Sequence, residues 1–120
     1  PLLDMVRYHM FGVGRAWIPE YGTAENADDF AWLYAYSPYH RVKKDETYPP
    51  LLMLSADTDD RVDPLHARKF VAQIEHAGAQ PLLRIEKNSG HGGADMRGAY
   101  AERAADMITF LRHHLMGGEG

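Results

Sequence analysis

The order of two short apolar segments and two helical patterns constrains the fold most. Residues 51–56 (LLMLSA) and 81–86 (PLLRIE) are apolar runs of strand length, and the first reads as a strand buried on both faces. Amphipathic helical patterns follow them over residues 64–77 and 98–115. The order strand, helix, strand, helix with short loops predicts an α/β fold, in which parallel strands alternate with helices that cover the sheet.

End signals support the helix over residues 64–77. Pro64 occupies a favoured first position, and Gly78 is the expected stop after the last turn. Asp63, directly before the proline, is expected to cap the helix. Four residues are expected to share its apolar face: Leu65, Phe70, Val71 and Ile74.

The first third of the chain is predicted to combine helices and a loop. Residues 2–10 have apolar spacing typical of a short helix or a helical turn. Residues 11–22 carry three glycines and one proline, which indicates a structured loop. A helix is expected over residues 26–36, with Asn26 or Asp28 as its cap.

Four aspartates and one arginine follow the first predicted strand within the ten residues SADTDDRVDP. A glycine-rich loop with His91 follows the second strand. Catalytic groups and ligands gather at the carboxyl ends of parallel strands, so an acid and a histidine would reach the same edge. An acid that orients a histidine is part of the serine hydrolase triad, and α/β-hydrolases order the triad Ser, Asp, His along the chain.

The acidic cluster has two other interpretations. An EF-hand calcium loop requires an acid where Arg61 stands and a glutamate where Arg68 stands, so no metal site is predicted. Solvated loop and cap residues are the other interpretation, in which Asp57 bonds the backbone of its own loop. No role is assigned to Asp57 or Asp60.

The other histidines are expected in ordinary positions. Four of them are expected on helix or loop surfaces: His9, His40, His66 and His76. His113 and His114 stand near the end of the last predicted helix, where positive charge suits the helix dipole.

Composition excludes several classes of protein. The 120 residues correspond to about one small domain, and the net charge of −4 gives no sign of a nucleic-acid partner. The absence of cysteine excludes disulfides, thiolate catalysis and cysteine zinc sites. No apolar run approaches the roughly 18 residues of a membrane span, and no signal peptide is visible. No cofactor is predicted.

Four stretches resemble the prolyl oligopeptidase family, in the C-terminal part of its catalytic domain. They are DMVRYHMFGVGRAWIPEYG, YSPYHRV, YPPLLMLSADTDDRVDPLHARKF and SGHGGADM, and the resemblance runs from Leu3 to Leu115. It implies an α/β-hydrolase domain of a serine peptidase that cleaves short peptides on the carboxyl side of proline.

The resemblance also implies roles for five residues. Asp59 would be the acid of the catalytic triad, and His91 its base. Arg61 would bond a substrate backbone carbonyl, a task that suits a fixed guanidinium fork. Trp17 would stack on the substrate proline ring, and Tyr21 would line the same pocket, because a flat aromatic surface fits an apolar ring.

One part of the family pattern is absent. No Gly-x-Ser-x-Gly occurs, and none of Ser37, Ser55 and Ser89 stands in such a context. We therefore expect residues 1–120 to be the C-terminal fragment of a catalytic domain, with the nucleophile serine, the oxyanion groups and a β-propeller upstream. The chain alone is expected to be inactive, because no nucleophile is present to be acylated, and poorly stable.

The expected partners are short proline-containing peptides and the missing N-terminal part of the same chain, but neither nucleic acid nor a membrane. Two alternatives stay open: a related hydrolase of other specificity, such as an acylaminoacyl peptidase or an esterase, and a non-catalytic binding module. A cytoplasmic location is expected, and a periplasmic one is left open.

Overall fold

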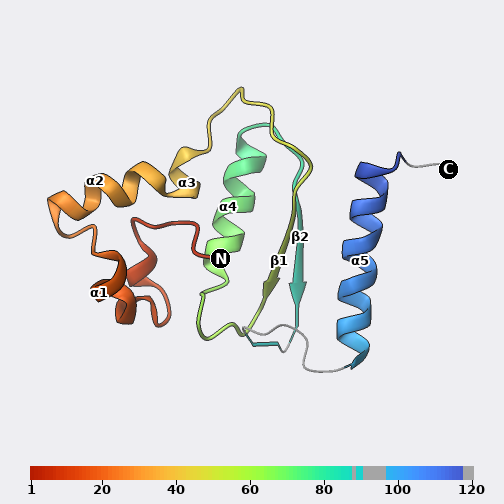
Figure 1. Ribbon diagram of the computed structural model, residues 1–120, viewed down its shortest axis with the longest axis horizontal. Helices are drawn as coiled ribbons and strands as arrows, with labels where there is room; N and C mark the ends of the chain where they lie inside the picture. Colours follow the sequence, from red (N-terminus) through yellow and green to blue (C-terminus); the bar gives the residue numbers. More distant parts are fainter. Residues whose placement is uncertain (88, 91–96, 118–120) are drawn as a thin grey trace.

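The computed structural model describes residues 1–87, 89–90 and 97–117. The elements follow one another along the chain (Figure 1) as 3-10 helices η1 (Tyr8–Met10) and η2 (Gly14–Trp17), helices α1 (Ile18–Tyr21), α2 (Ala27–Tyr36) and α3 (Pro38–Arg41), strand β1 (Leu52–Ala56), helix α4 (Leu65–His76), strand β2 (Leu82–Glu86) and helix α5 (Arg97–Leu115).

The two strands form a parallel pair, as the sequence pattern predicted. Leu52 pairs with Leu82, and the register continues to Ala56 opposite Glu86. Helix α4 connects the strands and packs against both of them, as Figure 1 shows. The predicted order of strand, helix, strand, helix is therefore confirmed, and both strands end at the same edge.

Helix α4 begins and ends where the sequence predicted. Asp63 Oδ1 accepts a hydrogen bond from the Leu65 backbone N–H at 2.9 Å, which confirms its capping role. Gly78 ends the helix with a φ of 99°, a conformation that glycine adopts without strain. The expected apolar face is wrong at Leu65, which is 39% exposed, because the helix turns Ala67 and Val71 toward the strands instead.

A second apolar cluster lies between the N-terminal segment and α2. It consists of Met5, Tyr8 and Leu33, the last two fully buried. The Asn26 side chain accepts hydrogen bonds from two backbone N–H groups of the first turn of α2, which confirms the predicted cap. Phe30 lies on the outer part of this helix and is 41% exposed.

Residues 11–22 are more regular than the predicted loop. They form η2 and α1, and Pro19 lies in the first turn of α1, where its missing N–H costs nothing. Gly14 is required where η2 passes the backbone of η1. A Cβ atom at Gly14 would lie 2.0 Å from the Tyr8 carbonyl oxygen. In residues 2–10 only Tyr8–Met10 are helical.

His66 is buried, although a surface position was expected. It is 2% exposed, and its Nδ1 accepts hydrogen bonds from the backbone N–H groups of Leu3 at 3.2 Å and Asp4 at 3.1 Å. An acceptor nitrogen carries no proton, so the imidazole is neutral with its proton on Nε2. Burial lowers the pKa of His66 below its ordinary 6.5, although the Asp4 carboxylate acts in the opposite direction. His9 is also buried rather than exposed.

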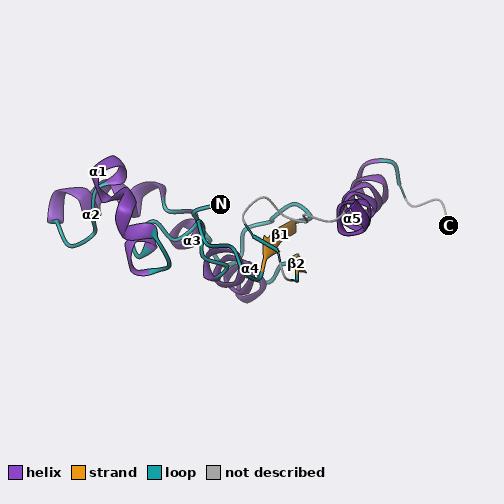
Figure 2. Ribbon diagram, turned by 90° about the horizontal axis from the view of Figure 1, so that it is seen from below, coloured by secondary structure: helices purple, strands orange, loops and turns teal. Residues whose placement is uncertain are grey.

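Helix α5 stands apart from the rest of the fold, as Figures 1 and 2 show. An ion pair from Arg84 of β2 to Asp106 of α5 bridges them, beside a cavity of about 420 Å³. The chain is accordingly extended, with a radius of gyration of 16.3 Å against about 14 Å for a compact domain of this length. Large apolar side chains stay exposed on β2 and α5: Leu82, Ile85, Tyr100, Met107, Ile108, Leu111 and Leu115.

These exposed side chains predict the behaviour of the purified 120-residue chain. We expect it to bind a hydrophobic dye such as ANS and to melt without a sharp transition, because much apolar surface stays in water. Replacing Ile108 and Leu111 together by glutamine should reduce the dye fluorescence. A sharp cooperative transition without dye binding would contradict this expectation.

The bonding of His66 predicts a pH dependence of stability. A lowered pKa in the folded state means that the stabilisation is complete above pH 6.5 and is lost as the pH falls through the folded pKa. In the whole protein that carries this chain, His66→Gln should lose about 1–3 kcal/mol of unfolding free energy at pH 7.5, because buried N–H groups lose a well-placed acceptor. The loss should shrink at pH 5.5, because the histidine of the unfolded wild-type chain binds a proton below pH 6.5 while the buried imidazole resists it, which lowers the stability of wild type but not of the variant.

Urea denaturation at the two pH values measures both free energies. His76→Gln is the matched control, because His76 lies on the same helix but is exposed. An equal difference between wild type and His66→Gln at both pH values would disprove the neutral-acceptor role.

Candidate functional site

The acid loop, residues 57–63, connects β1 to α4 and carries Asp59 and Arg61. Asp59 Oδ1 accepts hydrogen bonds from the backbone N–H groups of Arg61 at 3.0 Å and Val62 at 2.9 Å. Aspartate commonly closes a turn in this way, by bonding the backbone two and three residues further on. The carboxylate is therefore fixed relative to its own loop at the carboxyl end of β1.

Hydrogen bonds tie the acid loop to the segment that follows β2. The Thr58 backbone N–H and hydroxyl donate to the Ser89 carbonyl at 3.3 and 2.8 Å. Asp57 Oδ1 accepts from the Ser89 backbone N–H at 3.3 Å, and the Asp57 N–H donates to Glu86 at 3.0 Å. Asp57, which had no assigned role, therefore connects the two segments. Ser89 is buried and stands two residues before His91.

His91 itself lies outside the described residues. Its distance to Asp59 is accordingly not part of the structure, and the pairing of these two side chains stays a prediction. The structure does fix the backbone of Ser89, two residues earlier, beside Thr58 at the shared edge of the strands.

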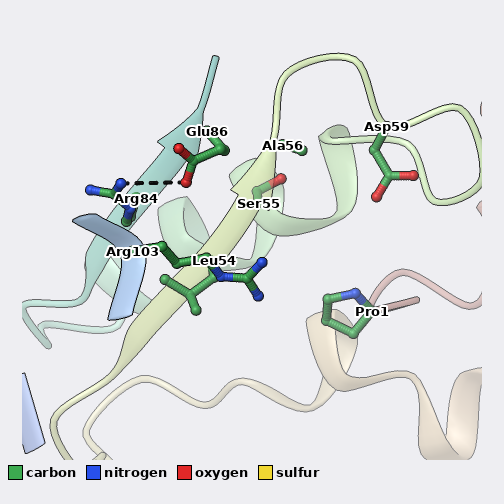
Figure 3. Close-up of a pocket in the computed structure, with 8 residues that line it drawn as sticks. All are labelled: Pro1, Leu54, Ser55, Ala56, Asp59, Arg84, Glu86 and Arg103. Atoms are coloured by element: carbon green, nitrogen blue, oxygen red, sulfur yellow. Dashed lines mark hydrogen bonds and ion pairs between the residues drawn. The ribbon is translucent and has the colours of Figure 1, made fainter. Parts of the chain in front are cut away.

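Asp59 also lines a cavity of about 140 Å³ at this edge. Figure 3 shows Arg84 and Glu86 of β2 on one side of it and Asp59 of the acid loop on the other. Arg84 Nη2 lies 3.4 Å from Glu86 Oε2, and the guanidinium of Arg103 contributes a second positive charge. The remaining lining residues are Pro1, Leu54, Ser55 and Ala56. The cavity is therefore polar, with both signs of charge around it.

Trp17 and Tyr21 lie together in the aromatic segment, residues 8–22. Trp17 ends η2, Tyr21 ends α1, and both side chains pack, partly buried, against the cluster of Met5, Tyr8 and Leu33. The Tyr21 ring meets the Tyr8 ring edge-on, with centroids 5.7 Å apart.

Tyr8 fixes the end of the aromatic segment. Its hydroxyl donates to the Gly22 carbonyl at 2.5 Å. Burial, reinforced by the nearby Tyr36 and Tyr21 hydroxyls, raises the pKa of Tyr8 above its ordinary 10.0, so the phenol remains a protonated donor at neutral pH. The bond holds the turn directly after Tyr21 in place.

The acid loop and the aromatic segment approach each other at Gly12. A Cβ atom added there would lie 3.8 Å from both Cβ and Oδ2 of Asp63. The Arg61 side chain is exposed, and the packing of Trp17 is with the cluster around Leu33. The structure therefore places Trp17 with Tyr21 in one segment and Asp59 with Arg61 in another, and the two segments approach each other where Gly12 meets Asp63.

Sequence reasoning missed a buried polar cluster behind the aromatic segment. Asp4 is fully buried, and its carboxylate forms an ion pair with Lys69 of α4 and a longer one with Arg7. Burial would raise the pKa of Asp4, but the Lys69 hydrogen bond and charge, the Arg7 backbone N–H and His40 together lower it below its ordinary 3.8. A charged residue within the apolar run LLDMV was the signal that could have revealed it.

This cluster includes a serine, a histidine and an aspartate, but not in a catalytic arrangement. His40 Nδ1 lies 2.8 Å from Ser37 Oγ and 3.8 Å from Asp4 Oδ1. A triad uses one ring nitrogen for the serine and the other for the acid, whereas both contacts here involve Nδ1. Ser37 Oγ also accepts the Met5 backbone N–H at 3.0 Å, and the residue is fully buried. The cluster is therefore structural.

Within the described part of the chain, no group of three or more potential ligands could hold a metal ion. In the same part, no helix has the length and apolarity needed to cross a membrane.

Comparison with known proteins agrees with this architecture. A profile of the prolyl oligopeptidase family matches residues 1–118. The prolyl oligopeptidase of Dendrothele bispora is 44% identical over 92% of this chain, which covers 16% of that protein. The prolyl endopeptidase of Elizabethkingia miricola is 39% identical over 95% of this chain, which covers 17% of that protein.

Solved structures give the same result. A prolyl endopeptidase structure superposes with a TM-score of 0.92 at 60% identity, over 96% of this chain and 17% of that chain. A post-proline cleaving enzyme from Rickettsia typhi superposes with a TM-score of 0.91 at 31% identity, over 97% of this chain and 17% of that chain. The predicted α/β-hydrolase fold class is therefore confirmed.

The match covers almost all of this chain but only a small share of its relatives. The chain spans about one sixth of the length of the curated relatives that it matches, between 15 and 17%. The sequence match, the identity to the relatives and the superposition point to the same group of proteins. The chain belongs to the prolyl oligopeptidase family.

Proposed function

We propose that this chain is part of a serine-type peptidase that hydrolyses short peptides on the carboxyl side of proline. In this proposal residues 1–120 supply the acid and the base of the triad and a wall of the proline pocket. The nucleophile serine comes from a part of the protein on the N-terminal side of Pro1. The single observation that carries the proposal furthest is the hydrogen bonding of Asp57 and Thr58 to Ser89, which brings the acid loop beside the segment that leads to His91.

The proposed reaction assigns a step to each residue. The serine hydroxyl attacks the carbonyl carbon of the proline residue, and His91 accepts its proton and passes it to the leaving amine. Water then hydrolyses the acyl-enzyme, with His91 again accepting the proton, and regenerates the serine. Asp59 bonds the imidazole, keeps it in the tautomer that can accept this proton, and stabilises the imidazolium that forms. The two backbone bonds that hold Asp59 support this role, because they restrict the carboxylate to one orientation.

Substrate recognition is assigned to Arg61, Trp17 and Tyr21. The exposed guanidinium of Arg61 donates to a backbone carbonyl of the peptide, where its planar fork gives direction. The rings of Trp17 and Tyr21 contact the proline ring, which offers no hydrogen-bond donor and is recognised by shape and apolar contact. The partly buried position of both rings in one packed segment supports this assignment.

The test compares two peptides with the whole protein that carries this chain. The peptides differ only in proline or alanine before the cleaved bond, and a serine-directed phosphonate reports the nucleophile. We expect cleavage of the proline peptide and labelling of one serine. Equal cleavage of both peptides would favour a hydrolase of other specificity, and a coding sequence without Gly-x-Ser-x-Gly upstream of Pro1, with no labelling, would favour a binding module. The cytoplasmic location stays a prediction.

The triad assignment predicts the effect of Asp59→Asn. We expect kcat for the proline peptide to fall by about 10⁴-fold, because an amide leaves the histidine in the wrong tautomer and does not stabilise its cation. Steady-state kinetics of the whole protein measure the loss. Asp60→Asn is the matched control, because the adjacent Asp60 is an exposed acid of the same loop. A similar loss in both variants would refute the assignment.

The pocket assignment predicts the effect of Trp17→Ala. We expect the preference for proline over alanine, as a ratio of kcat/KM, to fall by about 10-fold or more, because an apolar contact specific to the proline ring is lost. Trp17→Phe should retain part of the preference. The control is Trp32→Ala, since Trp32 is 51% exposed on α2. An unchanged ratio in a folded Trp17→Ala protein would rule the pocket role out.

A further inference from the structure

We infer that Lys69 is a positioning residue for proline specificity, which fixes the aromatic segment relative to the acid loop. This inference rests on the proposed function, because it concerns the distance between the residues proposed to bind proline and those proposed to carry out the reaction. Lys69 itself touches neither group. It acts through Phe11, the residue at which the chain turns from η1 toward η2.

The first step is the contact of α4 with Phe11. Lys69 Nζ lies 5.3 Å from the centroid of the Phe11 ring, and the His66 ring meets the same ring edge-on at 5.8 Å. Lys69 and His66 are three residues apart and therefore neighbours on the surface of α4. Phe11 is accordingly held by two successive positions of one helix face.

The second step is the anchoring of Lys69. Its ammonium forms an ion pair with the fully buried carboxylate of Asp4 and also lies 4.5 Å from the centroid of the Tyr39 ring. Its side chain is only 24% exposed. A cation with a buried counter-ion and two aromatic rings around it has little freedom to move, so it is a fixed point for Phe11.

The third step leads from Phe11 to the proposed proline pocket. The Phe11 carbonyl accepts the Gly14 backbone N–H at 2.9 Å, and Gly14 begins η2, which ends at Trp17. A displacement of Phe11 therefore moves the start of the short helix that carries Trp17. On the other side, α4 is continuous with the acid loop, because Asp63 caps its first turn at Leu65.

Lys69 thus joins the aromatic segment to the helix that directly follows Asp59 and Arg61. A loosened contact would leave each group intact but would change their separation. Substrate binding through Trp17 would then weaken, while the bond-breaking step, which depends on Asp59 and His91, would be retained. Such a loss raises KM and leaves kcat nearly unchanged.

The variants are chosen so that folding is preserved. Lys69→Met alone would leave the buried Asp4 carboxylate without its main counter-ion, so the test variant is the neutral pair Asp4→Asn with Lys69→Met. Lys69→Arg is the conservative variant, because it keeps a cation for Asp4 and for the aromatic rings. Lys44→Met is the matched control, since Lys44 is an exposed lysine outside both segments.

Two measurements on the whole protein decide the inference. We expect the neutral pair to raise KM for the proline peptide by about tenfold, to lower the preference for proline over alanine, and to change kcat little, because binding through Trp17 is weakened equally in the ground state and the transition state. We also expect faster hydrogen–deuterium exchange over residues 11–22. Lys69→Arg should restore most of the wild-type behaviour, and Lys44→Met should behave as wild type.

Each other outcome has a defined meaning. Unchanged exchange over residues 11–22 would overturn the inference, because the segment would then not depend on Lys69. Faster exchange with an unchanged proline preference would overturn it too, since the contact would serve stability alone. If the wild-type protein does not cleave after proline, the proposed function fails, and the specificity role falls with it. Faster exchange in the neutral pair would then show that the restraint exists without that role.

Discussion

The structure of the N-terminal half depends on one neutral imidazole. His66 accepts two backbone N–H groups, those of Leu3 and Asp4, at a place that is closed to water. A buried backbone donor without an acceptor costs about 1–3 kcal/mol, and this ring removes that penalty by accepting both groups. The bonded residues precede the aromatic segment by a few positions, so the same ring fixes the part of the chain that leads into it.

The buried carboxylate of Asp4, beside this imidazole, restricts how the N-terminal segment can pack. Asp4 is fully buried, and a buried carboxylate persists only when it is paired. Lys69 provides the main partner, and Arg7, through its backbone N–H and its guanidinium, and His40 are further partners. The pair adds little net stability compared with an apolar pair of equal volume, but removal of one member costs about 3–5 kcal/mol. An arrangement of the N-terminal segment that separated Asp4 from Lys69 would pay this cost. The ion pair therefore favours the observed position of the segment over other positions.

The sequence predicted the elements whose signals are local. The strands at 52–56 and 82–86 and the helices α4 and α5 could be recognised because a short apolar run and an amphipathic repeat are properties of neighbouring residues. The Asn26 cap could be found for the same reason. The α/β class followed from their order.

The errors concern properties that depend on residues far apart in the chain. Helix periodicity does not reveal which backbone will arrive opposite His66, and its partners Leu3 and Asp4 are more than 60 residues away. The same holds for Asp57, whose partner Ser89 belongs to another strand end. Residues 11–22 resemble a loop in the sequence because glycine is typical of flexible turns. In the structure, however, Gly14 is needed for close packing against the Tyr8 backbone.

The acid loop depends both on local sequence signals and on contacts between residues that are far apart in the chain. Its residues follow a strand end, and that position could be read from the sequence. Its shape, however, is set by bonds to Ser89 and Glu86 that exist only when β1 and β2 lie parallel and in register. A shift of one residue in this register would move Ser89 away from Thr58 and turn each side chain of β2 to the opposite face. The orientation of Asp59 therefore depends on local bonds, from the N–H groups of Arg61 and Val62, whereas the position of its loop relative to Ser89 depends on the pairing of the two strands. Catalytic geometry of the proposed kind requires both, because an acid that is well oriented but displaced by one residue cannot reach its base.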